Sequence, residues 1–193
     1  MVIAQRESPA TQSPYLDGQA PGQHTQMPVG PDDEPIPAIP ASAGALIFDR
    51  KGRLLILKPT YKSGWTIPGG VMEADGESPW EACQREVREE CGLTVRTGRL
   101  SCVDFRRPRP DRGRIGGIRY LFDCGRQDDA ALRAIELQPE EISEYRIVKL
   151  HKALTLLRGP IRRRVRAACA ANCAVYLEDG RPVPAVGSRE SVS

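Results

Sequence analysis

Short apolar runs on both sides of one amphipathic segment set out the middle of the chain. The runs at 43–48 and 54–57 are joined by the turn-like residues 49–52 and predict a β-hairpin. Further strands are expected at 93–105, 118–124 and 144–150. Strands before and after a central helix, with another helix near the end, predict an α/β fold in which a sheet packs between helices.

The amphipathic segment predicts a helix with clear ends. At about 100° per residue, one arc of roughly 80° collects the apolar stripe that faces a core, which consists of Trp80, Cys83, Val87 and Cys91. Ser78 is a good N-cap, Pro79 suits the first helical position, and Glu81 completes a capping box. Gly92 fits the left-handed position that closes a helix. The helix is therefore a well-bounded element on which ligand geometry can be held.

Three carboxylates converge on the adjoining side of this helix. Glu86, Glu89 and Glu90 fall within a separate arc of roughly 100°. Like charges so close repel one another and raise one another's pKa unless a positive charge lies among them. The economical explanation is a hard divalent cation.

Together with the glycines before it, this helix resembles the Nudix box, the signature of the Nudix hydrolases. The resemblance rests on Gly70, Glu77, Arg85-Glu86-Val87, Glu89-Glu90 and Gly92-Leu93. From Glu77 onward the family pattern is matched without a gap. Before it, six residues instead of five separate Gly70 from Glu77, an insertion that a loop containing Gly76 absorbs easily.

The resemblance implies an α/β/α sandwich with a mixed central sheet and a divalent-metal-dependent hydrolase. Its implied metal ligands for Mg²⁺ or Mn²⁺ are Gly70, Glu86, Glu89 and Glu90. Glu86 or Glu89 acts as the general base in such enzymes, and Arg85 is placed to pair with Glu89 and orient it. The implied reaction is hydrolysis of the diphosphate linkage in a nucleoside diphosphate joined to a moiety X, such as a nucleotide, ADP-ribose or a sugar nucleotide.

Further site residues are expected outside the helix. In the family a glutamate ahead of the final helix often joins the site as a ligand or base, and Glu141 matches best, with Glu140 and Glu144 as rivals. Arg119 follows an arginine-rich loop at 106–114 and is expected to bind the substrate's phosphates, because a guanidinium bonds phosphate in a bidentate way. Glu73, in the loop after the glycines, is the second expected substrate contact.

The C-terminal part predicts two helices, at 149–157 and 161–177, divided by Gly159-Pro160. The second contains a basic run, which a solvated helix face explains; the chain has no nucleic-acid motif, and no nucleic-acid partner is expected. The expected domains are a disordered proline-rich tail (1–40), a Nudix hydrolase domain (41–158), a C-terminal helical extension (159–180) and a flexible tail (181–193).

Composition and charge bear on the class of partner and on the cellular location. A formal charge of +3 in 193 residues gives no argument for nucleic acid or membrane, and no segment has the roughly 20 apolar residues of a membrane span. The tail shows no secretory signal. We therefore expect a cytoplasmic protein with reduced cysteines and a small-molecule partner. Dimerisation is a further possibility.

Two other functions remain open at this point. One is a catalytically silent Nudix-fold module that binds or senses nucleotide; three mutually repelling carboxylates argue against it, since a binder need not keep them. The other is an enzyme similar to isopentenyl-diphosphate isomerase, which shares the fold. That reaction needs a cysteine and a glutamate across the substrate double bond, and the cysteines here fall mainly at core or tail positions.

Overall fold

The strands form one mixed sheet in the computed structural model, which describes residues 38–184 and 186. The order across the sheet is β6-β2-β1-β5-β4-β7-β8, and β3 pairs with β1. The strands are β1 (Ala41–Phe48), β2 (Leu54–Pro59), β3 (Gly69–Val71), β4 (Arg99–Arg106), β5 (Gly117–Arg126), β6 (Ile142–Val148), β7 (Val175–Glu178) and β8 (Arg181–Pro182). The helices are α1 (Pro79–Cys91), α2 (Asp129–Arg133), α3 (Leu150–Leu156) and α4 (Gly159–Ala170), with a 3₁₀ turn η1 (Pro110–Arg112).

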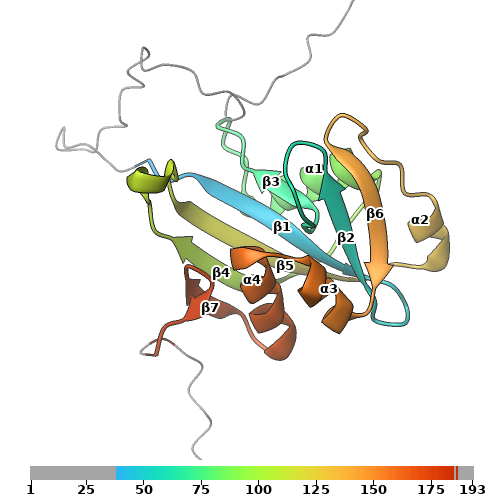
Figure 1. Cartoon of the computed structure of the whole chain (residues 1–193). Helices are drawn as coiled ribbons and strands as arrows, with labels where there is room; N and C mark the ends of the chain where they lie inside the picture. The colour runs from blue at the N-terminus through green and yellow to red at the C-terminus, as the bar shows by residue number, and fades with distance from the viewer. Residues whose placement is uncertain (1–37, 185, 187–193) are drawn as a thin grey trace, which may run out of the picture. The chain divides into compact units, whose positions relative to one another are not determined.

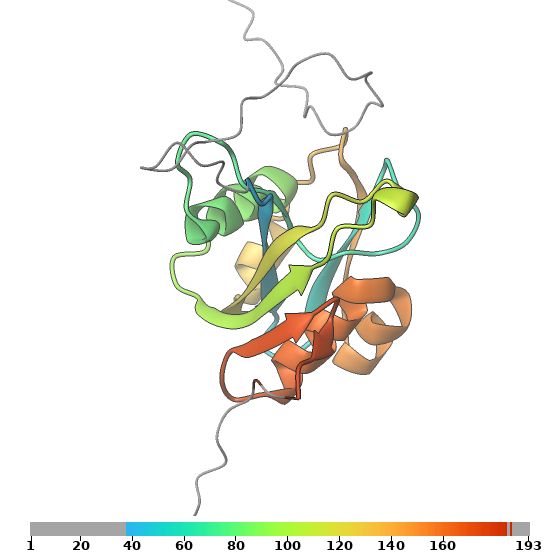
Figure 2. The ribbon, with the colours of Figure 1, turned by 90° about the vertical axis from the view of Figure 1, so that its left-hand side faces the viewer.

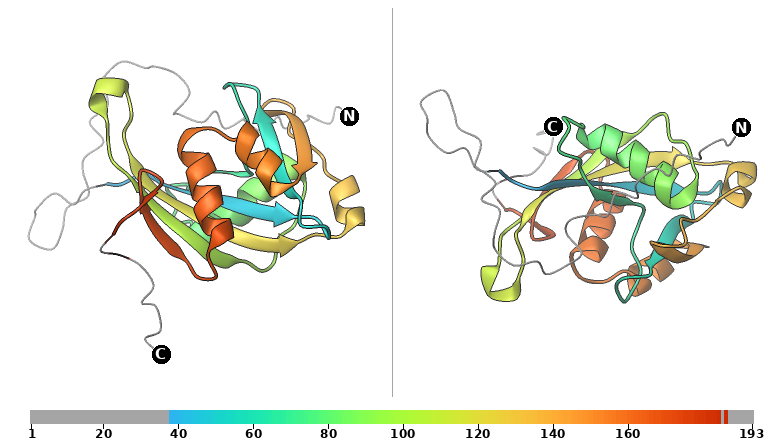
Figure 3. Two further views of the ribbon diagram at one scale, coloured as in Figure 1. Left: turned by 60° about the horizontal axis from the view of Figure 1, so that its bottom comes forward. Right: turned by 90° about the horizontal axis from the view of Figure 1, so that it is seen from above.

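Helices cover both faces of this sheet. Figures 1 and 3 show α1 on one face and α3 and α4 on the other, and Figure 2 shows the same layers from the side. Successive side chains of β1 pack alternately into the two cores, because a strand points them to opposite faces of the sheet. Ala45 and Ile47 share a core with Val87 of α1, whereas Leu46 shares one with Val165 of α4. The expected α/β/α sandwich with a mixed central sheet is confirmed.

The first two strands form the expected hairpin. Phe48 of β1 pairs with Leu54 of β2 in an antiparallel register. The Asp49 carboxylate holds the turn, because it accepts hydrogen bonds from the backbone N–H groups of Lys51 (3.0 Å) and Arg53 (2.7 Å). The rest of β1 pairs with β3 on one side and with β5, in parallel, on the other. This pairing brings the glycines of β3 into the middle of the sheet.

The strand expected at 93–105 begins later than predicted. Residues 93–98 have no regular structure, and β4 starts at Arg99. Leu93 and Val95 alternate with polar residues because they insert into the core under α1. Gly98 follows, where an added Cβ would lie 2.4 Å from the Trp80 ring. Loop packing therefore produces an alternation that looks like that of a strand.

The helix expected at 161–177 is wrong in its second half. α4 ends at Ala170, and Val175–Glu178 forms β7, which pairs in parallel with β4. Leu177 is buried in the core beneath α4. The strand exists because β4 offers it a partner edge, a long-range contact that local periodicity does not contain.

The two predicted tails fall mostly outside the described residues. Of the expected tail at 1–40, only 38–40 are described, and the Pro40 carbonyl accepts a hydrogen bond of 2.9 Å from the Ile118 N–H. Of the expected tail at 181–193, Arg181 and Pro182 pair with β7. In the described ranges, no helix combines the length and the apolar character needed to cross a bilayer.

Candidate active site on α1 and β3

Local signals fix both ends of α1. The Ser78 side chain accepts from the Glu81 N–H, and the Glu81 carboxylate accepts from the Ser78 N–H at 2.9 Å, so the predicted capping box is confirmed. Gly92 closes the helix with a φ of 66°. Cys83 and Cys91 lie fully buried in the core on the sheet side of α1, as expected. The glutamates of the next helical face are thus held on a rigid element.

The two glycines of β3 lie directly against these glutamates. The Gly69 N–H donates a 2.7 Å hydrogen bond to Oε2 of Glu90. At Gly70, an added Cβ would lie 2.3 Å from Oε1 of Glu86, so only glycine permits this approach. The contact exists despite the extra residue before Glu77. The insertion is absorbed in the loop, where Glu77 accepts from the Glu73 N–H at 2.9 Å.

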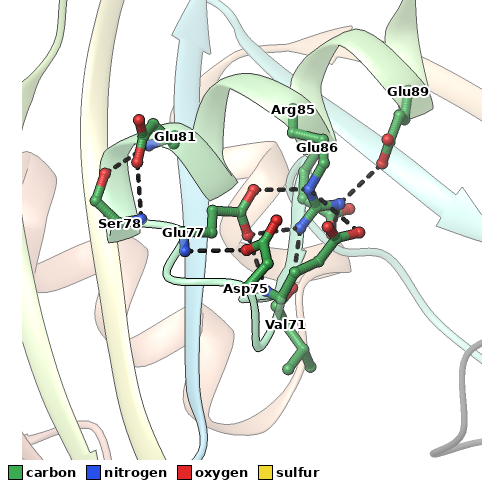
Figure 4. Close-up of polar contacts among 9 residues, drawn as sticks. Val71, Asp75, Glu77, Ser78, Glu81, Arg85, Glu86 and Glu89 are labelled. Atoms are coloured by element: carbon green, nitrogen blue, oxygen red, sulfur yellow. Dashed lines mark hydrogen bonds and ion pairs between the residues drawn. The ribbon is translucent and has the colours of Figure 1, made fainter.

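Arg85 is the centre of the polar network on this face (Figure 4). It bonds Glu77 in a bidentate way, with Nε 2.8 Å from Oε1 and Nη2 3.1 Å from Oε2. Its Nη1 donates to Glu86 and to Glu89, each at 2.9 Å, and Nη2 donates to the Val71 carbonyl at 3.1 Å. Only 16% of the Arg85 side chain is exposed. The expected pairing of Arg85 with Glu89 is present, and Glu77 joins as a partner that the sequence analysis had not given a role.

Two of the carboxylates, Glu90 and Glu86, have raised pKa values. The pKa of Glu90 is raised to about 8, chiefly by burial; the charges of Glu86 and Glu141 contribute to the rise, and the Gly69 N–H and Lys62 oppose it. Burial also raises the pKa of Glu86; Arg85 lowers it in part, and neighbouring carboxylates add to the rise. Converging buried carboxylates of this kind are stabilised by a cation.

Glu141 lies close enough to this group for its charge to raise the pKa of both Glu86 and Glu90. It sits immediately before β6, where its backbone carbonyl accepts a 2.8 Å hydrogen bond from the Thr60 N–H. Of its rivals, Glu144 instead pairs with Arg146 at 2.7 Å, and Glu140 is not among the charges that act on Glu86 or Glu90. These charge effects favour Glu141 among the three.

Two residues at the site were missed by the sequence analysis. Tyr61 and Lys62 lie in the loop after β2, with the Lys62 Nζ 5.0 Å from the centre of the Tyr61 ring. Partial desolvation and the charges of Glu90, Glu141 and Glu86 raise the pKa of Tyr61, although 52% of the residue is exposed. Glu90 likewise opposes the lowering of the Lys62 pKa by burial. The sequence signal was only an aromatic and a lysine in a loop before the glycine pair.

The two expected substrate contacts lie in different places, Glu73 at the rim of this network and Arg119 away from it. Glu73 is 57% exposed at the rim, 3.9 Å from Arg85, and lines a surface hollow of about 570 Å³ together with Glu77 and Arg88. Arg119 donates to backbone carbonyls, at 3.0 Å to Gly116 and 3.1 Å to Ile118. Burial and the charge of Arg106 lower the pKa of Arg119, and Asp104 opposes this shift. The α1 glutamates are not among the charges that act on it. The structure thus does not bring Arg119 together with the carboxylate group.

The chemistry of the donors fits Mg²⁺ or Mn²⁺. Both prefer oxygen ligands, and the buried carboxylates of Glu86 and Glu90 flank the backbone of β3. Within the described part of the chain, no three acidic, histidine or cysteine side chains form a ready-made metal cluster. Arg85 now engages two of the carboxylates, Glu86 and Glu89, so a cation there would require these side chains to turn.

Comparison with known proteins identifies the family of the chain. A model of the NUDIX domain matches residues 38–169. A MutT-like protein of Streptomyces ambofaciens is 30% identical over 109 residues, covering 53% of this chain and 66% of that protein. An ADP-ribose pyrophosphatase of Methanocaldococcus jannaschii is 32% identical over 87 residues, covering 44% of this chain and 51% of that protein. The chain thus spans about half to two thirds of the length of these curated relatives.

A solved structure shares the fold. The MutT protein of Methanosarcina mazei matches with a TM-score of 0.57 and 27% identity, over 68% of this chain and 93% of that one. The family model covers more than half of the chain, and the site just described lies inside the matched residues. The chain belongs to the NUDIX domain family.

Proposed function

We propose that this protein is a divalent-metal-dependent hydrolase of the diphosphate linkage in a nucleoside diphosphate joined to a moiety X. The observation that carries the proposal is the approach of Gly70 to Glu86, with Glu90 held by Gly69 and Arg85 bonded to the flanking glutamates. A binding module would have no need to bury carboxylates that raise one another's pKa. The arrangement supports a site made for a cation and an anionic substrate.

Each residue then has a role that follows from its contacts. Glu86, Glu89 and Glu90, with the Gly70 carbonyl, would hold Mg²⁺ or Mn²⁺. The bound metal would neutralise charge on the diphosphate and lower the pKa of water. Arg85 keeps Glu89 oriented, since its own position is fixed by the bidentate bond to Glu77.

The reaction is a water attack on one phosphorus. A new P–O bond forms, the bond to the bridging oxygen breaks, and that oxygen leaves with the other phosphate. The water's proton passes to a carboxylate, for which Glu86, Glu89 and Glu141 are the candidates. Glu89 is 47% exposed and can turn towards substrate, whereas Glu141 lies near enough for its charge to act on Glu90.

Tyr61 and Lys62 are proposed substrate contacts. Lys62 is the cation that the loop after β2 brings to the carboxylate group, and a lysine ammonium is a common ligand of phosphate. Glu73 and Arg119 remain proposed contacts for parts of the substrate beyond the diphosphate. The proposal also places the enzyme in the cytoplasm, and homodimerisation stays a prediction.

The isomerase alternative lacks support from the cysteines. Cys83 and Cys91 of α1, and Cys102 and Cys124 of the sheet, are all buried in the two cores. None of them is free to approach a substrate double bond beside the glutamates. Hydrolysis therefore remains the better reading of the site.

The test is product release from a panel of nucleotide, ADP-ribose, dinucleotide and sugar-nucleotide substrates, each with Mg²⁺, Mn²⁺ or EDTA. We expect turnover of at least one class with metal and none with EDTA, and the best substrate identifies X. Nucleotide binding by folded protein without turnover of any panel member would instead support a silent binding module.

A further inference from the structure

A second cluster of charged side chains lies on the face of the sheet opposite α1. On β4, Asp104 and Arg106 follow Cys102 at two-residue steps, and on β5, Arg119 precedes Leu121 by two. Cys102 and Leu121 belong to the core beneath α4. Because side chains two apart on a strand share a face, all three charged residues point to the α4 side.

Arg164 of α4 completes this group, which we name the Asp104 cluster (Asp104, Arg106, Arg119 and Arg164). Its Nε lies 3.6 Å from Oδ2 of Asp104, which is fully buried. The pKa of Arg164 is lowered to about 10, chiefly by burial and in part by the charges of Arg106 and Arg119, while Asp104 opposes the shift. Three guanidinium groups therefore share one carboxylate, and the cluster carries an excess of positive charge.

Two buried atoms of the cluster lack a hydrogen-bond partner among the described residues: Nε of Arg106 and Oδ2 of Asp104. Buried polar atoms in folded proteins nearly always have a partner, so such orphans indicate a bound water or ion. Here one orphan is a donor and the other an acceptor. A single group that bridged the two atoms would accept from Arg106 and donate to Asp104, and the excess of guanidinium groups favours one that carries negative charge.

We propose that the Asp104 cluster binds a protonated phosphate group, either as inorganic phosphate or as a terminal phosphate monoester. Its oxygens accept from the guanidinium groups, while its P–OH donates to Oδ2 of Asp104. Sulfate fits less well because it has no proton to donate. The site lies across the sheet from the carboxylates of α1 and does not depend on the proposed hydrolysis.

Binding of inorganic phosphate to the full chain tests this directly. Calorimetric titration in EDTA at about pH 6 keeps metal out and leaves a large share of the phosphate protonated. We expect phosphate to bind at least tenfold more tightly than sulfate at equal ionic strength. Arg106→Gln removes a charge that has no hydrogen bond at Nε, and should weaken phosphate binding about tenfold or more.

The matched control is Arg162→Gln, which removes an exposed charge from the same helix α4. It should leave phosphate affinity within about twofold of the wild type. Equal losses in both variants would mean a general charge effect and would overturn the proposal. So would the absence of phosphate binding by the wild type, which would leave a bridging water as the partner.

Asp104→Asn separates a ligand site from a structural ion network. Asparagine keeps an oxygen for the 2.7 Å bond that Asp104 accepts from the Gly180 N–H, but it can replace the orphan acceptor with an amide donor. The preference for phosphate over sulfate should then vanish or reverse. An unchanged preference would contradict the proposal.

The source of the phosphate is distinguished by the ligand used in the titration. If the ligand is a phosphate monoester, a simple monoester such as phenyl phosphate binds more tightly than inorganic phosphate, and Arg106→Gln weakens its binding about tenfold or more. If the ligand is free phosphate, inorganic phosphate binds more tightly than the monoester, and Arg106→Gln weakens phosphate binding to the same extent.

Discussion

Gly70 packs so closely against Glu86 that any side chain at position 70 would collide with the Glu86 carboxylate. An added Cβ would be 2.3 Å from Oε1, 2.5 Å from Cδ and 2.8 Å from Oε2 of Glu86. The contact joins β3 to α1, two elements that follow one another in the sequence. It couples the glycine motif of the sequence to the chemistry proposed for the site.

Gly70→Ala should therefore damage activity more than stability. The new methyl group must displace Glu86, and we expect kcat/KM to fall by a factor of about 10². The free energy of unfolding should fall by only about 1–3 kcal/mol, as for other overpacked positions. Steady-state kinetics and thermal melting measure the two effects. Val71→Ala, at the next and more exposed position, should change neither strongly.

Glu77 should make stability depend on pH through Arg85. The hydrogen bond from Arg85 holds the pKa of Glu77 below its usual value of 4.5. A carboxyl whose folded-state pKa is depressed stabilises the fold above its unfolded pKa and loses that contribution as the pH falls through the folded pKa. Melting temperatures of wild type and Glu77→Gln should differ at pH 6–7 and converge as the pH falls below the usual pKa of 4.5 and through the lowered pKa of Glu77. Parallel curves across this range would contradict the role of the Arg85–Glu77 pair.

Glu141 and Glu140 offer a matched pair of substitutions in one turn. Glu141 acts on the pKa of Glu86 and Glu90, while Glu140 contributes its backbone carbonyl to Thr60 at 2.7 Å. Glu141→Gln should lower kcat by a factor of at least about 10 if the carboxylate is a ligand or base. Glu140→Gln should leave kcat within about twofold. Equal kcat values for the two variants would contradict a role of Glu141 as a ligand or base.

Lys62 should affect binding of the substrate more than the chemical step. Loss of one charge-assisted contact to phosphate predicts a rise in KM of about tenfold for Lys62→Gln, with kcat largely retained. Lys58→Gln is the control, because Lys58 lies near the end of β2, just before the same loop, and faces Glu144 at 3.9 Å. If both variants raise KM alike, a diffuse charge effect explains the result better than a contact.

The sequence contains the local parts of this structure. The caps of α1, its buried cysteines and its row of glutamates depend on neighbours within one or two turns, and each was predictable. The pairing of Arg85 with Glu89 spans one turn and was predictable for the same reason.

Long-range partners were not predictable in the same way. Arg85 meets Glu77 only because the loop before α1 folds back onto the helix. Tyr61 reaches the carboxylates through a loop without periodicity, and Leu177 becomes part of a strand because β4 has a free edge for it. Such contacts depend on the assembled sheet and leave little trace in local sequence patterns.

The most direct test of the central claim compares Glu89→Gln with Glu81→Gln in the Mg²⁺-dependent hydrolysis assay. Both changes remove one carboxylate charge from α1, but glutamine can keep the capping box at position 81. The account predicts that Glu89→Gln lowers kcat by a factor of about 10² or more while Glu81→Gln keeps nearly full activity. Full metal-dependent activity in folded Glu89→Gln would contradict the proposed role of this carboxylate in catalysis.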